Sequence, residues 1–438
     1  MVDRISPLAK RGGLTPELDY DLYVGIDAAM KAHEVCVLRS DRSVVGERSV
    51  PHTGSGIEGL INWLLQLSQA GPDRVAAALE SPHGALAEAL MEHGFHLYSI
   101  NPKQLDRFRD RHTVAGAKDD RRDAFVLADS LRTDRPCFRR LQIDEPLMIQ
   151  LREVSRIEEE LNQEARRLAN RLHAQVYRLH PGVLQLCPAA DEAWFWELLE
   201  LIPTPQQAAR LRPGLIDKLL RKHRIRRLSA REVTAQLREP VPPVAPGTIE
   251  AARAHIDVLL PQLRVVQTQR RKCQNQIERF LEELASSGTA EGQKTEHHDV
   301  QVLRSLPGVG RVVAATMLAE ASRALVDRDH PALRAHAGIA PVTRRSGKTK
   351  IVVMRYACNT RLRNALYHAA RVAVQKDSAS RALYAAQRAR GHGHARALRS
   401  VADRLLRILF AMLRTRTLYD DRHVRRVPPG EVRRSKAA

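Results

Sequence analysis

The first third of the chain alternates between short apolar runs and amphipathic segments. Apolar runs at 22–27, 33–40, 43–50, 74–80 and 95–100 lie between turn residues and predict strands. Segments 57–67 and 84–94 place apolar residues at helical spacing and predict helices. Strands that alternate with helices indicate an α/β domain with a partly parallel sheet.

Two long apolar stripes at helical spacing follow, from Leu147 to Leu179 and from Ile249 to Leu284. The first predicts a coiled coil that pairs protomers, because so long a stripe needs a partner helix. The alternative is antiparallel packing of the two stripes within one chain, with the Pro-rich insert at their tip. Pro261 should kink the second helix or delay its start. The basic segment Leu215–Leu228 predicts either a phosphate-binding helix or a solvated face.

The remaining third predicts a mainly helical C-terminal part. In Val302–Glu320, a Pro-Gly-Val-Gly turn between two short helices predicts a helix-hairpin-helix-like motif. Its glycines, Gly308 and Gly310, would let backbone N–H groups approach a phosphate; the alternative is a tight turn without a ligand. We therefore expect three domains: an α/β domain at 20–140, long helices at 141–290 and a C-terminal domain at 291–425.

Composition points to a nucleic-acid partner. The formal charge is +21, and residues 381–438 carry 15 Lys or Arg against 4 Asp or Glu. Such a charge favours a polyanion, and an aromatic content of 4% favours phosphate contacts over base stacking. The five scattered cysteines fit a reducing compartment, and no apolar run is long enough to span a bilayer, so we expect a cytoplasmic protein without a membrane partner.

Four carboxylates form a candidate metal site. Asp27 and Glu80 each end a predicted strand, where open α/β sheets usually bind ligands. Asp120 and Asp123 lie three residues apart and share one face of a predicted helix. Such oxygen donors suit Mg²⁺ or Mn²⁺, and two metal ions can drive phosphodiester chemistry. The alternative is a helix start enriched in Asp because of the helix dipole. Asp119 and Asp129 are expected to be solvated surface charges.

A candidate nucleophile lies in the last third. Ser346 is surrounded by Arg344, Arg345, Lys348 and Lys350, whose charges would stabilise an oxygen that attacks a phosphodiester. The downstream arginines Arg355, Arg361 and Arg363 are expected to bind the same phosphate or its neighbours. The alternative is an ordinary turn serine.

Together these motifs resemble one family. An Asp–Glu–Asp–Asp set that includes KDDRRDA at 118–124 is followed by PGVG at 307–310, AGIAP at 337–341 and RRSGK at 344–348. This order resembles the RuvC-like DEDD transposases of bacterial insertion sequences, which are related to the Piv-type DNA invertases. Asp119 stands where the family usually has Thr, which affects how the helix is capped. The 185–245 segment is longer than usual for the family.

The resemblance implies an RNase H-like N-terminal domain whose acids Asp27, Glu80, Asp120 and Asp123 hold metal. It also implies that Ser346 becomes covalently joined to DNA, that the protein works as a dimer or tetramer, and, for at least one branch, that a structured guide RNA takes part. We expect a transposase that cuts and rejoins DNA. The alternatives are a RuvC-like structure-specific endonuclease, a DNA invertase, and a nucleic-acid-binding protein without catalysis.

Overall fold

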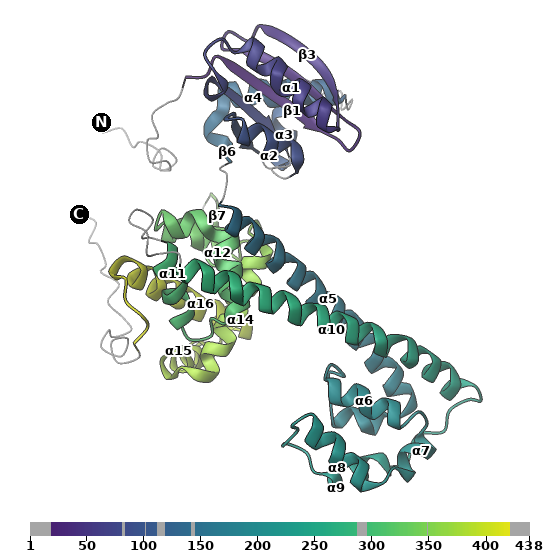
Figure 1. Cartoon of the computed structure of the whole chain (residues 1–438). Coiled ribbons are helices and arrows are strands. Elements are labelled where there is room, and N and C mark those ends of the chain that lie inside the picture. The colour runs from purple at the N-terminus through teal and green to yellow at the C-terminus, as the bar shows by residue number, and fades with distance from the viewer. Residues whose placement is uncertain are drawn as a thin grey trace. The chain divides into compact units, whose positions relative to one another are not determined.

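The computed structural model describes residues 19–80, 84–100, 102–111, 119–141, 145–286, 296–347 and 349–420. The chain forms two compact units, 1–144 and 145–438, each of which is described by itself (Figure 1). The three-domain division of the sequence stays a prediction.

Unit 1 is built on one six-stranded sheet. Its strands run in the order β3-β2-β1-β4-β5-β6; β4 is parallel to β1 and β5, and the other pairs are antiparallel. The strands are β1 Leu22–Ala28, β2 Ala32–Arg39, β3 Val44–Pro51, β4 Val75–Leu79, β5 His96–Ser99 and β6 Arg139–Arg140. The predicted α/β domain with a partly parallel sheet is confirmed.

Helices cover both faces of this sheet (Figure 1). Helices α1 (Gly54–Leu67) and α2 (Ala85–Glu92) pack on one face, where Val24 and Ile26 of β1 are buried. Helices α3 (Pro102–Arg109) and α4 (Asp120–Asp134) pack on the other, against Ala76 and Ala78 of β4. Successive side chains of a strand point to opposite faces, so Gly25 and Asp27 belong to the α4 face. Short 3₁₀ turns occupy Pro72–Arg74 and Arg135–Cys137.

Unit 2 is organised around two long helices, α5 (Pro146–Leu179) and α10 (Thr248–Ser286), which lie side by side (Figure 1). The intrachain alternative is therefore the one that the structure shows. Helix α10 contains Pro261 and begins well before it, so the expectation of a delayed start was wrong. Leu151 and Val176, near the two ends of the first stripe, are buried, but Ile157 in its middle is 45% exposed. Pairing of protomers through this middle part stays a prediction.

The Pro-rich insert forms a small helical tip at one end of α5 and α10 (Figure 1). Its core contains the fully buried Trp194 and Phe195. The basic segment predicted within it has local partners, since Lys222 contacts Glu197 and Arg227 contacts Glu192. The tip comprises a 3₁₀ turn at Pro181–Gln185, α6 Ala193–Leu201, α7 Pro205–Arg210, α8 Pro213–Lys222 and α9 Ala230–Leu237.

The opposite end of α5 and α10 packs into a mainly helical C-terminal lobe, as predicted. The lobe comprises α11 Glu296–Ser305, α12 Arg311–Val326, α13 His330–His336, the hairpin β7 Val342–Ser346 and β8 Thr349–Val353, α14 Thr360–Lys376, α15 Ser378–Ala389 and α16 His394–Thr415. Its apolar core is formed mainly by α12, α14 and α16. Among the described residues, every helix is too short or too polar to cross a membrane.

Candidate active site

Three of the four predicted acids meet in unit 1. Asp27 lies near the end of β1, and Asp120 and Asp123 lie in the first turn of α4. One ligand oxygen from each lies within 4.8 Å of the others. Glu80 directly follows β4, whose register pairs Ile26 with Leu79, so it is the neighbour of Asp27 along the sheet edge. Glu80 is half-buried and lies outside this group of three.

Gly25 explains why α4 comes so close to Asp27. A Cβ atom at this position would lie 1.9 Å from the backbone oxygen of Ala124 and 2.5 Å from the backbone nitrogen of Ala128. Only glycine permits this contact, which brings the first turn of α4 to the strand that carries Asp27. The sequence analysis missed this role, although a glycine inside an apolar strand often marks a close backbone approach.

Arg109 binds the most buried of the acids. Its Nε and Nη2 each donate a hydrogen bond of 2.8 Å to the carboxylate of Asp123, which is 3% exposed. Burial favours the neutral form of the guanidinium, but the hydrogen bonds and charge of Asp123 outweigh it, and the pKa of Arg109 is raised. This partner was also missed, because no motif or spacing links Arg109 to the acids.

Of two further aspartates, Asp119 is exposed as expected and Asp129 is not. Asp119 is the N-cap of α4 and accepts a hydrogen bond from the backbone N–H of Arg121, so Asp fulfils the capping role of Thr. Asp129 is buried rather than a surface charge, and it pairs with Arg132 and Arg42. The expectation for Asp129 was therefore wrong, because α4 is covered on more sides than one apolar stripe indicates.

Ser346 lies in unit 2, at the end of β7 and opposite Thr349 of β8. The serine and its neighbours Arg344, Arg345 and Lys350 are all exposed. Lys348 lies outside the described residues. Gly347, next to the serine, has a φ of 52° and forms the turn of the hairpin. The structure therefore presents the serine near the tip of a short two-stranded hairpin.

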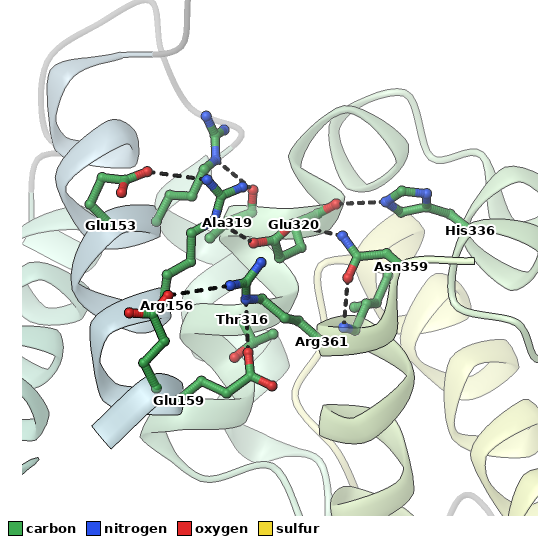
Figure 2. Close-up of polar contacts among 12 residues, drawn as sticks. Glu153, Arg156, Glu159, Thr316, Ala319, Glu320, His336, Asn359 and Arg361 are labelled. Atoms are coloured by element: carbon green, nitrogen blue, oxygen red, sulfur yellow. Dashed lines mark hydrogen bonds and ion pairs between the residues drawn. The ribbon is translucent and has the colours of Figure 1, made fainter. Parts of the chain in front are cut away.

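The base of this hairpin is held by one asparagine and one buried carboxylate (Figure 2). The backbone N–H of Asn359 donates to His336 O at 2.8 Å. This bond joins the two ends of the segment that connects α13 to α14 and contains the hairpin. The Asn359 side chain donates to Glu320 at 2.7 Å and caps α14 by accepting from the N–H of Leu362. These bonds fix the start of α14 relative to α12.

Glu320 is also the partner of α5. Arg156 Nε lies 3.0 Å from its carboxylate, and the side chain of Glu320 is 9% exposed. Burial raises the pKa of Glu320, but the hydrogen bonds from Arg156 and Asn359 outweigh it and the pKa is lowered. The sequence contained no signal for this role, since a single Glu on an apolar helix has many possible partners.

The other predicted phosphate-binding residues have varied surroundings. Gly308 has a φ of 87°, and a Cβ atom there would lie 2.1 Å from Ala369 O, so this glycine is needed for packing against α14. Gly310 precedes α12 and has open space around it. Arg355 donates to Ala340 O, Arg361 forms an ion pair of 2.8 Å with Glu159, and Arg363 contacts the sulfur of Cys358 at 3.9 Å. Their binding of nucleic acid stays a prediction.

Two family models match this chain. The family model for DEDD transposases of the IS110 type, whose description is "Transposase", matches residues 24–181, a segment that contains all four acids. The model described as "Transposase IS116/IS110/IS902 family" matches residues 300–385, which include the serine hairpin and its base.

Relatives from insertion elements match as well. A Sinorhizobium fredii protein named "Putative transposase y4uE" is 47% identical over 209 residues, which make up 48% of this chain and 58% of that protein. The Streptomyces coelicolor "Mini-circle putative transposase for IS117" is 28% identical over 91% of this chain and 95% of its own length. The 43.6 kDa protein of insertion element IS110 from the same species is 27% identical over 92% of this chain and 96% of its own.

Proposed function

Because the chain belongs to the DEDD transposase family of insertion sequences, we propose that it cuts and rejoins DNA strands with the acids of unit 1 and Ser346 of unit 2. The observation that carries the proposal is the meeting of Asp27, Asp120 and Asp123, with Glu80 beside Asp27 in the sheet. Three carboxylates this close repel each other, and a bound cation would reduce that repulsion in addition to Arg109, which pairs with Asp123.

The donor set fits a hard divalent cation. All its ligand atoms are carboxylate oxygens, which suit Mg²⁺ or Mn²⁺ better than soft metals. Asp27, Glu80, Asp120 and Asp123 would hold the metal, which when bound stabilises charge on the phosphate oxygens. Burial of Asp123 and the contact of Gly25 with α4 keep the carboxylates in place before any ligand binds.

The serine supplies the covalent step. Ser346 Oγ loses its proton and forms a bond to phosphorus, while the bond from phosphorus to the leaving DNA oxygen breaks and that oxygen is protonated. A DNA hydroxyl then attacks the serine ester, which releases the serine and joins the new strand. In this proposal Arg344, which shares a face of the hairpin with Ser346, neutralises the charge on the phosphate during both steps, and Arg345 and Lys350, a pair on the other face, add to the positive charge around it.

The partners in this proposal are DNA and a second copy of the chain. Acids and serine belong to separate units, so the reaction requires them to meet at one phosphate, within a chain or between protomers. The family resemblance extends the proposal to a guide RNA. A RuvC-like nuclease remains the competing function, in which the acids alone hydrolyse DNA and Ser346 is a turn residue.

Loss of single acids tests the metal-dependent part of the proposal. Asp120→Asn and Glu80→Gln should abolish strand cleavage in Mg²⁺ and leave DNA binding nearly intact, because carboxylates repel phosphates and add nothing to non-specific affinity. The measurement is cleavage of DNA that contains the element ends, with binding followed in parallel. Full cleavage by both variants would refute the assignment.

A further inference from the structure

Helices α14 and α16 bring arginines from distant parts of the sequence to the short connection between β8 and α14. Tyr367 of α14 contacts His394 of α16, with 3.3 Å between the phenol oxygen and Nε2. Arg399 Nη2 lies 2.9 Å from Sδ of Met354, which comes before α14. Arg363, at the start of α14, contacts Cys358 in the same short connection between β8 and α14. Arg396 lies one turn before Arg399 on the same face of α16.

These arginines have poor hydrogen-bond acceptors as partners. Arg399 contacts the thioether of Met354, and Arg363 contacts the thiol of Cys358 at 3.9 Å. Sulfur is a weak acceptor for a guanidinium, which normally pairs with a carboxylate. Within the described part of the chain, neither of them nor Arg396 forms an ion pair. Arg334, in the same lobe, is by contrast bound to Asp403 at 2.5 Å.

The electrostatic surroundings of Arg399 agree with this geometry. Burial and the nearby charges of Arg396 and Arg363 lower its pKa, although Tyr356 acts in the opposite direction. Solvated surface arginines tolerate each other, but a half-buried guanidinium beside two like charges is costly without an anion.

We propose that Arg363, Arg396 and Arg399 form a binding site for a phosphate of a nucleic-acid strand. The site adjoins the end of β8, since Met354 directly follows that strand, and it therefore lies at the base of the hairpin that carries Ser346. Tyr356, which is 77% exposed, is placed to contact the sugar or base next to this phosphate.

The surrounding charge favours nucleic acid over an isolated anion or an acidic peptide. Residues 355–420 contain 14 Lys or Arg against 3 Asp, so a strand that leaves the site continues along a basic surface. The inference rests on the proposed function, because it assigns this site to the DNA strand that Ser346 attacks.

A pair of double variants tests the site in the full-length protein. Arg363→Gln with Arg399→Gln removes two of the three guanidinium groups. Arg371→Gln with Arg414→Gln removes the same charge from exposed positions of the same two helices. The probe is a fluorescent DNA duplex of generic sequence, titrated at several salt concentrations.

The site variant should bind the duplex at least about tenfold more weakly, and its slope of log K against log salt should fall by about 2. The control should change both quantities much less. Equal behaviour of the two variants would overturn the proposal.

Protection of the wild-type protein provides a readout that no folding defect of a variant can affect. Phenylglyoxal modifies accessible arginines, and peptide mass mapping locates the products. Bound DNA should protect Arg363 and Arg399 more than Arg371; equal protection of all three would contradict the site. A DNA adduct at Ser346 without this selective protection would leave the proposed function standing and remove the inference. Selective protection without any adduct would support the phosphate site and contradict the covalent step of the proposed function.

Discussion

The acid site and the serine hairpin are held in place by different physical means. Asp27, Asp120 and Asp123 lie where a strand and a helix touch through a glycine, and Asp123 is 3% exposed. Ser346 lies near the tip of an exposed two-stranded hairpin whose order comes from its base, at Asn359 and Glu320. The comparison indicates a rigid setting for the proposed metal ligands and a more adaptable carrier for the proposed nucleophile.

The largest expected difference between the two regions is the loss of stability on replacing one glycine in each. Gly25→Ala should destabilise unit 1 by about 3 kcal/mol or more, because its Cβ would overlap Ala124 O and push α4 from β1. Gly347→Ala should cost about 1 kcal/mol at most, since only its positive φ opposes a side chain and the surrounding space is open. Thermal unfolding of both variants measures the difference. A stable Gly25→Ala protein with normal Mn²⁺ binding would contradict the role of this contact.

The base of the hairpin should respond to loss of the Glu320 charge. Glu320→Gln should cost about 2 kcal/mol and increase hydrogen exchange at the N–H of Asn359, because Arg156 keeps a weaker partner. Glu153→Gln is the matched control, since Glu153 also pairs with Arg156 but is exposed. If the two variants lose equal stability in urea unfolding, the buried contact has no special role.

The stability of the protein should also depend on pH through Glu320. The pKa of Glu320 in the folded protein is lowered from the usual 4.5. Its contribution to stability is therefore fully present above that value and is lost as the pH falls through the lower pKa of the folded state. Below pH 4.5 the wild-type protein should lose stability more steeply than Glu320→Gln. Parallel curves for the two proteins would contradict this.

Arg109 should compete with metal for Asp123. We expect Arg109→Gln to bind Mn²⁺ about tenfold more tightly, because a positive charge and two hydrogen bonds no longer oppose the cation. Without metal the variant should unfold at a lower temperature, since Asp123 is left buried without its partner. Calorimetric titration measures the affinity, with the exposed Arg107→Gln as control. Weaker binding by Arg109→Gln would mean that this arginine orients Asp123 for the metal.

The smallest effect on folding is expected in the middle of the long helices. Ile157→Asp with Val265→Asp changes two residues that are 45% and 60% exposed, and should cost less than about 0.5 kcal/mol. If protomers pair through this region, the variant should still have a lower mass in solution than the wild-type oligomer. An unchanged mass by light scattering would place the protomer contact elsewhere.

Local sequence patterns predicted the elements of unit 1 well, because period-two apolar runs and turn residues fix strands with little help from tertiary contacts. They also grouped Asp27, Asp120 and Asp123 with Glu80. The end of a strand and the spacing of residues along a helix can be read from the sequence, and they decide which side chains lie together. Partners that come from elsewhere in the fold were not predictable. Arg109 reaches Asp123, and Arg156 reaches Glu320, only after helices distant in sequence have packed. The same holds for Gly308. Its sequence, Pro-Gly-Val-Gly, is typical of a phosphate-binding turn, and its close contact with Ala369 of a distant helix could not be predicted from that sequence.

The most direct test of the central claim is the covalent step at Ser346. The protein is incubated with DNA and Mg²⁺, denatured and digested, and the DNA-linked peptide is identified by mass spectrometry, with Ser346→Ala, Ser346→Cys and Asp120→Asn in parallel. We predict an adduct at Ser346 in the wild-type protein, none for Ser346→Ala or Asp120→Asn, and at most a trace for Ser346→Cys, whose thiolate is also nucleophilic. An adduct at another residue, or normal strand exchange by Ser346→Ala, would contradict the account.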